Sequence, residues 1–282
     1  MKFKNLFNLS DEKNISFMSS ILAIICGLLF GLLILLVSKP SHALGGFAMI
    51  VQGGFTDGIK GIGQVLYIAT PIIMTGLSVG FAFKTGLFNI GASGQFTMGA
   101  FAAIWIGVKM PIQPAFLHCL LALVCAILAG AAWAFIPGFL KAFFNVNEVI
   151  SSIMMNYIGM YAVNIMIKNS VYDRVKNQSK AVMATANLGK AGLDKIFPGT
   201  SINVGILIAI FSVILIHILL NKTVFGYELK ACGQNSFASR YAGINAKKNI
   251  ILSMLIAGGL AGLGGAFVTL ATVSQFRPAV IV

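Results

Sequence analysis

The chain alternates long apolar runs with short segments that hold its charges. Seven runs contain no Asp, Glu, Lys or Arg, and each is at least 19 residues long. That is about the length an α-helix needs to cross the hydrocarbon core of a membrane. The runs cover residues 14–38, 61–83, 85–108, 110–140, 149–167, 196–221 and 249–276. The pattern therefore predicts an integral membrane protein that crosses the bilayer several times.

We expect about seven transmembrane helices, packed as an all-α, polytopic bundle that forms a single domain over residues 1–282. The predicted helices span residues 15–37, 62–83, 87–108, 114–135, 149–167, 202–220 and 250–273. A Gly-containing connector with room for a short helix covers residues 38–60, and polar loops cover residues 168–200 and 221–248. The first apolar run is too long for the core of a signal peptide, which holds about 7–15 residues. We therefore expect it to be retained as the first helix.

The composition supports this class and excludes several others. Apolar residues make up 58% of the chain and charged residues only 10%, and the mean hydropathy is +0.92. A soluble domain carries about 25% charged residues, so a soluble enzyme and a secreted protein are excluded. The net charge of +13 would suggest nucleic acid in a soluble protein. Here it is explained by basic loops beside anionic lipid, so we expect membrane lipid and no nucleic acid as a partner.

The sequence predicts neither a catalytic site nor a metal site. The four cysteines show no CxxC or Cys/His spacing, so a disulfide framework and a metal site are not expected. The glycines of residues 91–99 are not followed by the Gly-Lys-Ser/Thr of a phosphate-binding loop. Proton-coupled transport normally uses ionisable groups within the membrane, and the seven runs hold no carboxylate. This argues against a secondary transporter.

Residues 84–100 place glycines and polar side chains, among them Asn89, Ser93 and Gln95, directly against an apolar stretch. Lipid does not satisfy free backbone amides, so irregular backbone here is expected to line protein or a water-filled path. The alternative is an ordinary tight turn between two helices. A broken helix would also explain why Lys and Arg do not orient the chain. Simple alternation leaves ten of them on each side, and the positive-inside rule then decides nothing.

A second polar segment, residues 225–248, is too polar to cross the membrane but is predicted to hold a short helix between Gly233 and Gly243. Phe237 and Tyr241 lie four residues apart and would share one face of that helix. A compact amphipathic helix outside the bilayer suits docking into a groove on a partner. The alternative is a solvated connector.

Three sequence motifs carry a resemblance to a known family of membrane proteins. They are Gly86-Leu-Phe-Asn-Ile-Gly-Ala-Ser-Gly-Gln95, Asn147-Glu-Val-Ile-Ser-Ser-Ile-Met-Met-Asn-Tyr157, and Gly226-Tyr-Glu-Leu-Lys-Ala231 followed by Tyr241-Ala-Gly-Ile244. Over about residues 60–275 the chain resembles the permease subunits of bacterial ABC importers in the ribose, branched-chain amino acid and nucleoside group. It is most similar to nucleoside permeases that work with a basic membrane lipoprotein type of receptor.

The resemblance implies a permease of the bacterial cell membrane that passes nucleosides by alternating access. Residues 221–248 would be a cytoplasmic coupling loop that contacts an ABC ATPase subunit, with residues 1–14 on the same side. Residues 168–200 would be an extracytoplasmic loop, on the side where a substrate-binding lipoprotein docks. ATP and Mg²⁺ would be bound by the separate ATPase, so this chain is expected to hold no cofactor and catalyse no reaction. A second, related permease would complete the path.

The resemblance also indicates candidate functional residues. Those expected to couple to the ATPase are Glu228, Lys230, Gly233, Phe237, Arg240, Tyr241 and Gly243, and those expected to line the substrate path are Phe88, Asn89, Ser93, Gln95 and Asn156. Aromatic and amide groups suit a purine with a ribose, although the same groups also serve packing. Ser93 stands where family members often carry an acidic residue, which leaves the role of that position open. Family members continue after the position of Val282, so we expect the C-terminal helices of the family to be absent here.

Three alternative functions remain at this level. The cargo of the same kind of importer would be ribose, another simple sugar or a branched-chain amino acid. A different class would be an autonomous secondary transporter or channel. The third is a truncated remnant that does not transport.

Overall fold

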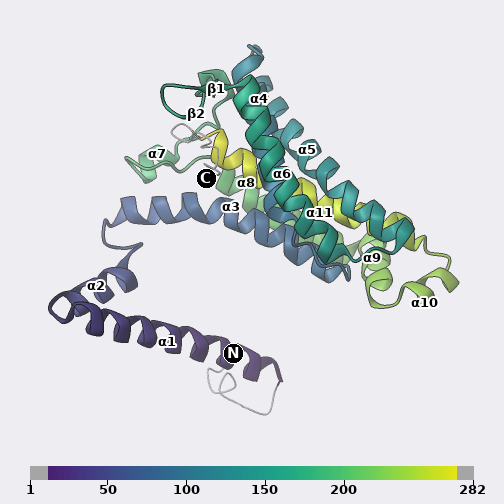
Figure 1. Cartoon of the computed structure of the whole chain (residues 1–282), viewed down its shortest axis with the longest axis horizontal. Coiled ribbons are helices and arrows are strands. Elements are labelled where there is room, and N and C mark those ends of the chain that lie inside the picture. Colours follow the sequence, from purple (N-terminus) through teal and green to yellow (C-terminus); the bar gives the residue numbers. More distant parts are fainter. Residues whose placement is uncertain (1–11, 272–282) are drawn as a thin grey trace. The chain divides into compact units, whose positions relative to one another are not determined.

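The computed structural model describes residues 12–271 and divides the chain into two compact units, residues 1–61 and residues 62–282. Figure 1 shows that helices form nearly all of the regular structure in the described part. The prediction of an all-α membrane protein is confirmed. The prediction of one domain over residues 1–282 remains a prediction.

The first unit is built from two helices and the start of a third. Helix α1 spans Glu12–Ser38 and helix α2 spans Pro40–Gln52. Pro40 opens α2, a position that suits proline because the first helical residue needs no N–H donor. The connector predicted over residues 38–60 therefore holds the expected short helix. The apolar side chains of α1 are largely exposed, as in a helix whose neighbour is lipid.

The second unit is a bundle in which helix α11, Ala246–Thr269, lies at the centre (Figure 1). Around it lie α3 (Ile59–Lys84), α4 (Ala92–Lys109), α5 (Ala115–Phe144), α6 (Glu148–Ser170) and α8 (Gly205–Lys222). The buried positions of α11 are mostly Gly and Ala. Without a hydrophobic force between helices in lipid, such small residues let neighbouring backbones pack closely, and α11 packs along both α5 and α4.

Six helices in the described part are long and apolar enough to cross a membrane: residues 21–38 of α1, and α3, α5, α6, α8 and α11. The remaining predicted span, residues 87–108, differs from its expected form. It becomes the shorter helix α4, preceded by backbone that is not helical at residues 87–89. Its first turn carries Ser93 and Gln95, and α4 packs against α5, α6 and α11. The polar residues of its first turn, which contact protein, explain why α4 is not one of these six helices.

The two long polar loops lie at opposite ends of the second unit (Figure 1). The loop over residues 168–200 contains a two-stranded antiparallel hairpin, β1 (Tyr172–Asp173) with β2 (Gln178–Ser179), the 3₁₀ helix η2 (Ala184–Ala186) and α7 (Leu193–Ile196). Backbone bonds tie it to the bundle: Met183 N–H donates to the Gly107 carbonyl at 2.8 Å, and Leu188 N–H to the Leu270 carbonyl at 2.9 Å. The membrane side of each loop remains a prediction.

The loop over residues 221–248 folds into two helices, α9 (Val224–Gln234) and α10 (Ser236–Tyr241). These two helices and α11, which follows them, each begin at a residue whose side chain accepts hydrogen bonds from backbone N–H groups, a common signal for the start of a helix. The capping residues are Thr223 for α9, Asn235 for α10 and Asn245 for α11. The predicted short helix between Gly233 and Gly243 is α10, and α9 adds a second one before it.

Candidate functional site

The first part of the candidate site is the break between α3 and α4. Non-helical backbone within a bundle leaves peptide groups that need partners. Asn156 of α6 supplies two of them: its Oδ1 accepts from Gly94 N–H at 2.8 Å, and its Nδ2 donates to the Ile90 carbonyl at 2.7 Å. Asn156, predicted to line a path, thus holds the break in place with its amide.

Asn89 and Gln95 form a closed pair across the same break. The Nδ2 of Asn89 donates to the Oε1 of Gln95 at 2.9 Å, and the Nε2 of Gln95 donates to the Oδ1 of Asn89 at 3.0 Å. Each side chain is only 1% exposed. The structure therefore places these two predicted path residues inside the packing, where each satisfies the polar groups of the other.

Ser93 lies at a surface groove that runs beside α4. One cavity of 470 Å³ lies between α4 and α6, and another of 500 Å³ lies between α3 and α4. Both are lined by Ser93 and Thr97, and we call the two together the Ser93 groove. The other polar residues that line it are Thr75, Asn156 and Tyr157. None of the described residues that line it is Asp, Glu, Lys, Arg or His.

Thr75, Thr97 and Tyr157 were not among the predicted path residues. Thr97 follows Ser93 by four positions, so the two share one face of α4, and that spacing would have identified it. Thr75 and Tyr157 come from other helices, and no spacing within the sequence links them to Ser93. Phe88, which was predicted, is 37% exposed and packs its ring edge-on against Phe83, 4.7 Å between centroids.

The second part of the candidate site is the elbow formed by α9 and α10. Phe237 and Tyr241 are 73% and 95% exposed, and both lie on α10. Arg240 is also exposed. Gly243 has φ +80°, a left-handed conformation that L side chains rarely adopt. It follows the end of α10, so a side chain at this position would strain the turn.

The remaining predicted coupling residues turn toward the bundle or pair locally. Glu228 accepts from the Nδ2 of Asn249 on α11 at 3.4 Å. Lys230 donates from Nζ to the Oδ1 of Asn221 at 3.4 Å. Of the predicted coupling residues, Phe237, Arg240 and Tyr241 are therefore the ones that α10 exposes at the surface.

The elbow and the break touch through backbone. A Cβ added to Gly233 would lie 2.5 Å from the Thr85 carbonyl carbon and 2.6 Å from the Gly86 nitrogen. Only glycine permits this approach at position 233, because a Cβ would meet main-chain atoms, which cannot move aside as the end of a flexible side chain can. Leu87, next along the break, and Leu229 of α9 belong to one buried apolar cluster. The elbow is thus joined directly to the segment that carries the Asn89–Gln95 pair.

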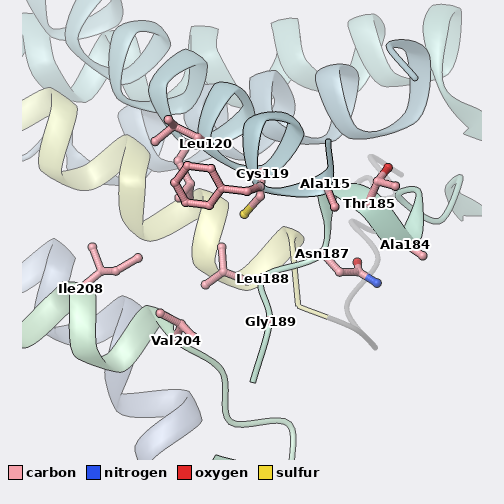
Figure 2. A pocket seen from close by; sticks show the side chains of 12 residues that line it. Ala115, Cys119, Leu120, Ala184, Thr185, Asn187, Leu188, Gly189, Val204 and Ile208 are labelled. Carbon is pink, nitrogen blue, oxygen red and sulfur yellow. The ribbon is translucent and has the colours of Figure 1, made fainter. Parts of the chain in front are cut away.

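A third cavity, of 360 Å³, opens between α5, residues 184–189 and α8 (Figure 2). Figure 2 shows Leu120, Leu188 and Ile208 among the apolar side chains around it. Of its polar residues, Thr185 bonds the Nδ1 of His118 at 2.8 Å, and the Nε2 of His118 lies 3.2 Å from the Ile106 carbonyl. His118 is therefore a buried, hydrogen-bonded structural residue. Among the described residues no group of three or more His, Cys, Asp or Glu is arranged to hold a metal ion.

Comparisons with known proteins agree on one kind of molecule. Residues 61–280 match the family model described as "Branched-chain amino acid transport system / permease component". The chain is 43% identical to the guanosine ABC transporter permease protein NupP of Bacillus subtilis over 252 residues, which are 89% of this chain and 71% of the relative. It is 37% identical to the nucleoside ABC transporter permease protein NupB of Lactococcus lactis, covering 87% of this chain and 68% of the relative.

More distant similarity extends to a sugar permease. The chain is 30% identical to the glucose ABC transporter permease protein TsgB13 of Haloferax volcanii, over 78% of this chain and 59% of the relative. No solved structure matches the chain.

Proposed function

The chain belongs to the family of permease components of branched-chain amino acid transport systems, and on that premise we propose that it forms the membrane path of an ATP-driven importer of nucleosides. It is a multi-pass membrane protein. The observation that carries the proposal is its similarity, over most of its length, to permeases named for guanosine and for nucleosides. The geometry of the Ser93 groove adds an independent argument about the cargo.

The lining of the Ser93 groove suits an uncharged molecule with several hydroxyl groups. Ser93 offers a hydroxyl, Thr97 and Thr75 offer acceptor oxygens because their hydroxyls donate to the Ser93 and Pro71 carbonyls at 2.7 and 2.9 Å, and Tyr157 is 58% exposed and offers an aromatic face. Stacking together with directional hydrogen bonds orients a base and a ribose. An amino acid carries two charges, and moving them out of water without charged partners is costly. The described lining supplies no such partners, so a branched-chain amino acid is the poorer fit.

A simple sugar is the second candidate cargo. The hydroxyl lining serves a sugar as well as a ribose, and one relative is named as a glucose permease. The two cargoes differ in the base, whose stacking partner on this chain would be Tyr157. Replacing Tyr157 therefore separates them: it weakens nucleoside uptake and leaves sugar uptake unchanged.

The driving force in this proposal reaches the groove through the elbow. A separate ATPase subunit binds ATP and Mg²⁺ and docks on α10 through Phe237 and Tyr241. Movement of α10 is passed through the backbone contact at Gly233 to residues 85–91, and so to the start of α4 and the groove. A second permease would close the groove from the other side, and a substrate-binding lipoprotein would dock at the end that carries residues 168–200.

The test is uptake in cells that lack other nucleoside importers, with the chain expressed beside its ATPase, its partner permease and its lipoprotein. We expect uptake of labelled guanosine that stops when the ATPase is inactivated. Uptake of ribose or leucine in place of guanosine would refute the proposed cargo. Uptake by this chain alone in liposomes without ATP would refute the proposed class and identify an autonomous transporter or channel.

A further inference from the structure

Four cations gather where α5 ends and α11 begins. Lys141, Arg240 and Lys247 line one cavity of 660 Å³, and Lys247 and Lys248 line a neighbouring one of 500 Å³. We call these four residues the basic cluster. They come from three elements: Lys141 from α5, Arg240 from α10, and the two others from α11. Figure 1 shows the end of α5 and the start of α11 beside α9 and α10.

Among the described residues, the chain supplies an acidic partner for only one of the four cations of the basic cluster. Lys141 pairs with Glu148 at 3.0 Å, and among the described residues this is the one ion pair. Lys247 lies over the ring of Phe143, 4.7 Å from its centroid. Lys247 and Lys248 also occupy the first turn of α11, where the helix dipole disfavours cations. Helix stability therefore does not explain why these lysines are present.

A ridge of phenylalanine rings leads along α5 to the basic cluster. Phe135, Phe139 and Phe143 follow one another at four-residue spacing, with centroids 5.6 and 4.8 Å apart, and Phe144 lies 6.0 Å from Phe139. Phe135, Phe143 and Phe144 are 41%, 51% and 67% exposed. Because α5 is long and apolar enough to cross a membrane, this Phe ridge is suited to contact lipid acyl chains. The lysines follow at the end of the ridge, as expected for groups that meet lipid headgroups.

We infer that the basic cluster and the Phe ridge together bind an anionic phospholipid. The phosphate of the headgroup lies between Lys247 and Lys248, and one acyl chain lies along the ridge. Basic pockets between transmembrane helices are suited to anionic headgroups because the attraction acts at the membrane surface. The ridge distinguishes this ligand from a soluble anion, which gains nothing from exposed rings. The inference rests on the membrane location of α5 and α11 and is independent of the cargo, although the larger cavity is also lined by Phe237 and Arg240 of the docking helix α10.

The test titrates the purified full chain, in a mild non-ionic detergent, with phosphatidylglycerol and with phosphatidylcholine, and counts bound lipid by native mass spectrometry. We expect phosphatidylglycerol to bind more tightly than the zwitterionic lipid. In the variant Lys247→Gln/Lys248→Gln, the affinity for phosphatidylglycerol falls about fivefold for each lysine, or about 25-fold together. The affinity for phosphatidylcholine stays unchanged.

Two matched controls distinguish binding at this site from non-specific electrostatic attraction and from non-specific hydrophobic contact with lipid. Lys222→Gln/Lys230→Gln removes the same charge at the same end of the unit, and neither residue lines either cavity, so lipid affinity should be retained. Phe143→Ala should weaken phosphatidylglycerol binding severalfold. Phe211→Ala, which removes a ring 62% exposed on α8, should not.

Two results would overturn the inference. The first is unchanged phosphatidylglycerol binding in the Lys247/Lys248 variant; if ATPase co-purification is also reduced in that variant, the surface is a protein-docking site. The second is displacement of the lipid by inorganic phosphate at an equal concentration, which would identify a soluble-anion site. Because the helix dipole disfavours lysine at these positions, the double variant is expected to unfold no earlier than the wild type on heating, so misfolding does not mimic the expected loss.

Discussion

Replacing Gly233 with Ala tests whether the elbow drives the break through direct contact. The new Cβ would lie 2.5 Å from the carbonyl carbon and oxygen of Thr85 and 2.6 Å from the nitrogen of Gly86. Non-bonded heavy atoms normally sit about 3.5–4.0 Å apart. The atoms on both sides are main chain, so no rotamer change relieves the clash, and α9 and the break must separate by about 1 Å.

The expected cost in stability is moderate. Overpacking of this kind lowers the free energy of unfolding by about 1–3 kcal/mol. The higher helix propensity of Ala than of Gly within α9 offsets up to about 1 kcal/mol of this loss. The variant should therefore still insert into the membrane. The exposed faces of Phe237 and Tyr241 do not change, so the ATPase should still co-purify with it.

The transport rate is where the effect should appear. Because the separation breaks the path of movement between α10 and residues 85–91, we expect ATP-driven guanosine uptake to fall by roughly tenfold, while ATP hydrolysis by the complex continues. The assay compares uptake and hydrolysis in the same proteoliposomes. Gly80→Ala is the control, since a Cβ there meets nothing within 4 Å. Uptake at the wild-type rate in Gly233→Ala would refute direct transmission, and so would an equal loss in the control.

Three further predictions follow from the same contacts. Phe237→Ala/Tyr241→Ala removes the two exposed rings of α10 and should weaken ATPase binding about 100-fold or more; an ATPase that co-purifies undiminished contradicts this, with membrane insertion as the control. Asn156→Leu leaves two part-buried backbone groups unpaired, so it should destabilise the chain by about 1–3 kcal/mol and lower its unfolding temperature in detergent; an unchanged temperature would mean that water replaces the amide. Ser93→Ala removes one hydroxyl from the groove and should raise the half-saturating guanosine concentration about fivefold, as for one lost neutral hydrogen bond; an unchanged value would exclude Ser93 from the path.

Much of the helical layout is readable from the sequence because charge is expensive in lipid. The charge-free runs located every span, and the polar segment at residues 84–100 indicated the break before α4. The ends were less certain: α5 continues through Pro137 to Phe144, nine residues beyond the predicted end at residue 135. Residues 110–140 carry no Asp, Glu, Lys or Arg, so hydropathy does not mark where within or beyond this run the helix ends.

The site was predicted less completely, for a physical reason. Amide side chains in a membrane either face a path or satisfy other polar groups, and composition does not distinguish the two. Asn89 and Gln95 satisfy one another, whereas Ser93 faces the groove. The contact between Gly86 and Gly233 joins two residues far apart in the chain that have no side chains. Such a contact leaves no pattern of hydrophobic or polar positions from which to predict it.

The central claim is that α10 lies in the cytoplasm, where an ATPase reaches it. Tyr241 is 95% exposed, so a cysteine at this position, in a variant whose four native cysteines are replaced by Ala, reports its side directly. A membrane-impermeant thiol reagent should leave Tyr241→Cys unmodified in intact cells and modify it in inverted vesicles. Modification in intact cells would contradict the account, because a docking helix on the outer face cannot be moved by a cytoplasmic ATPase.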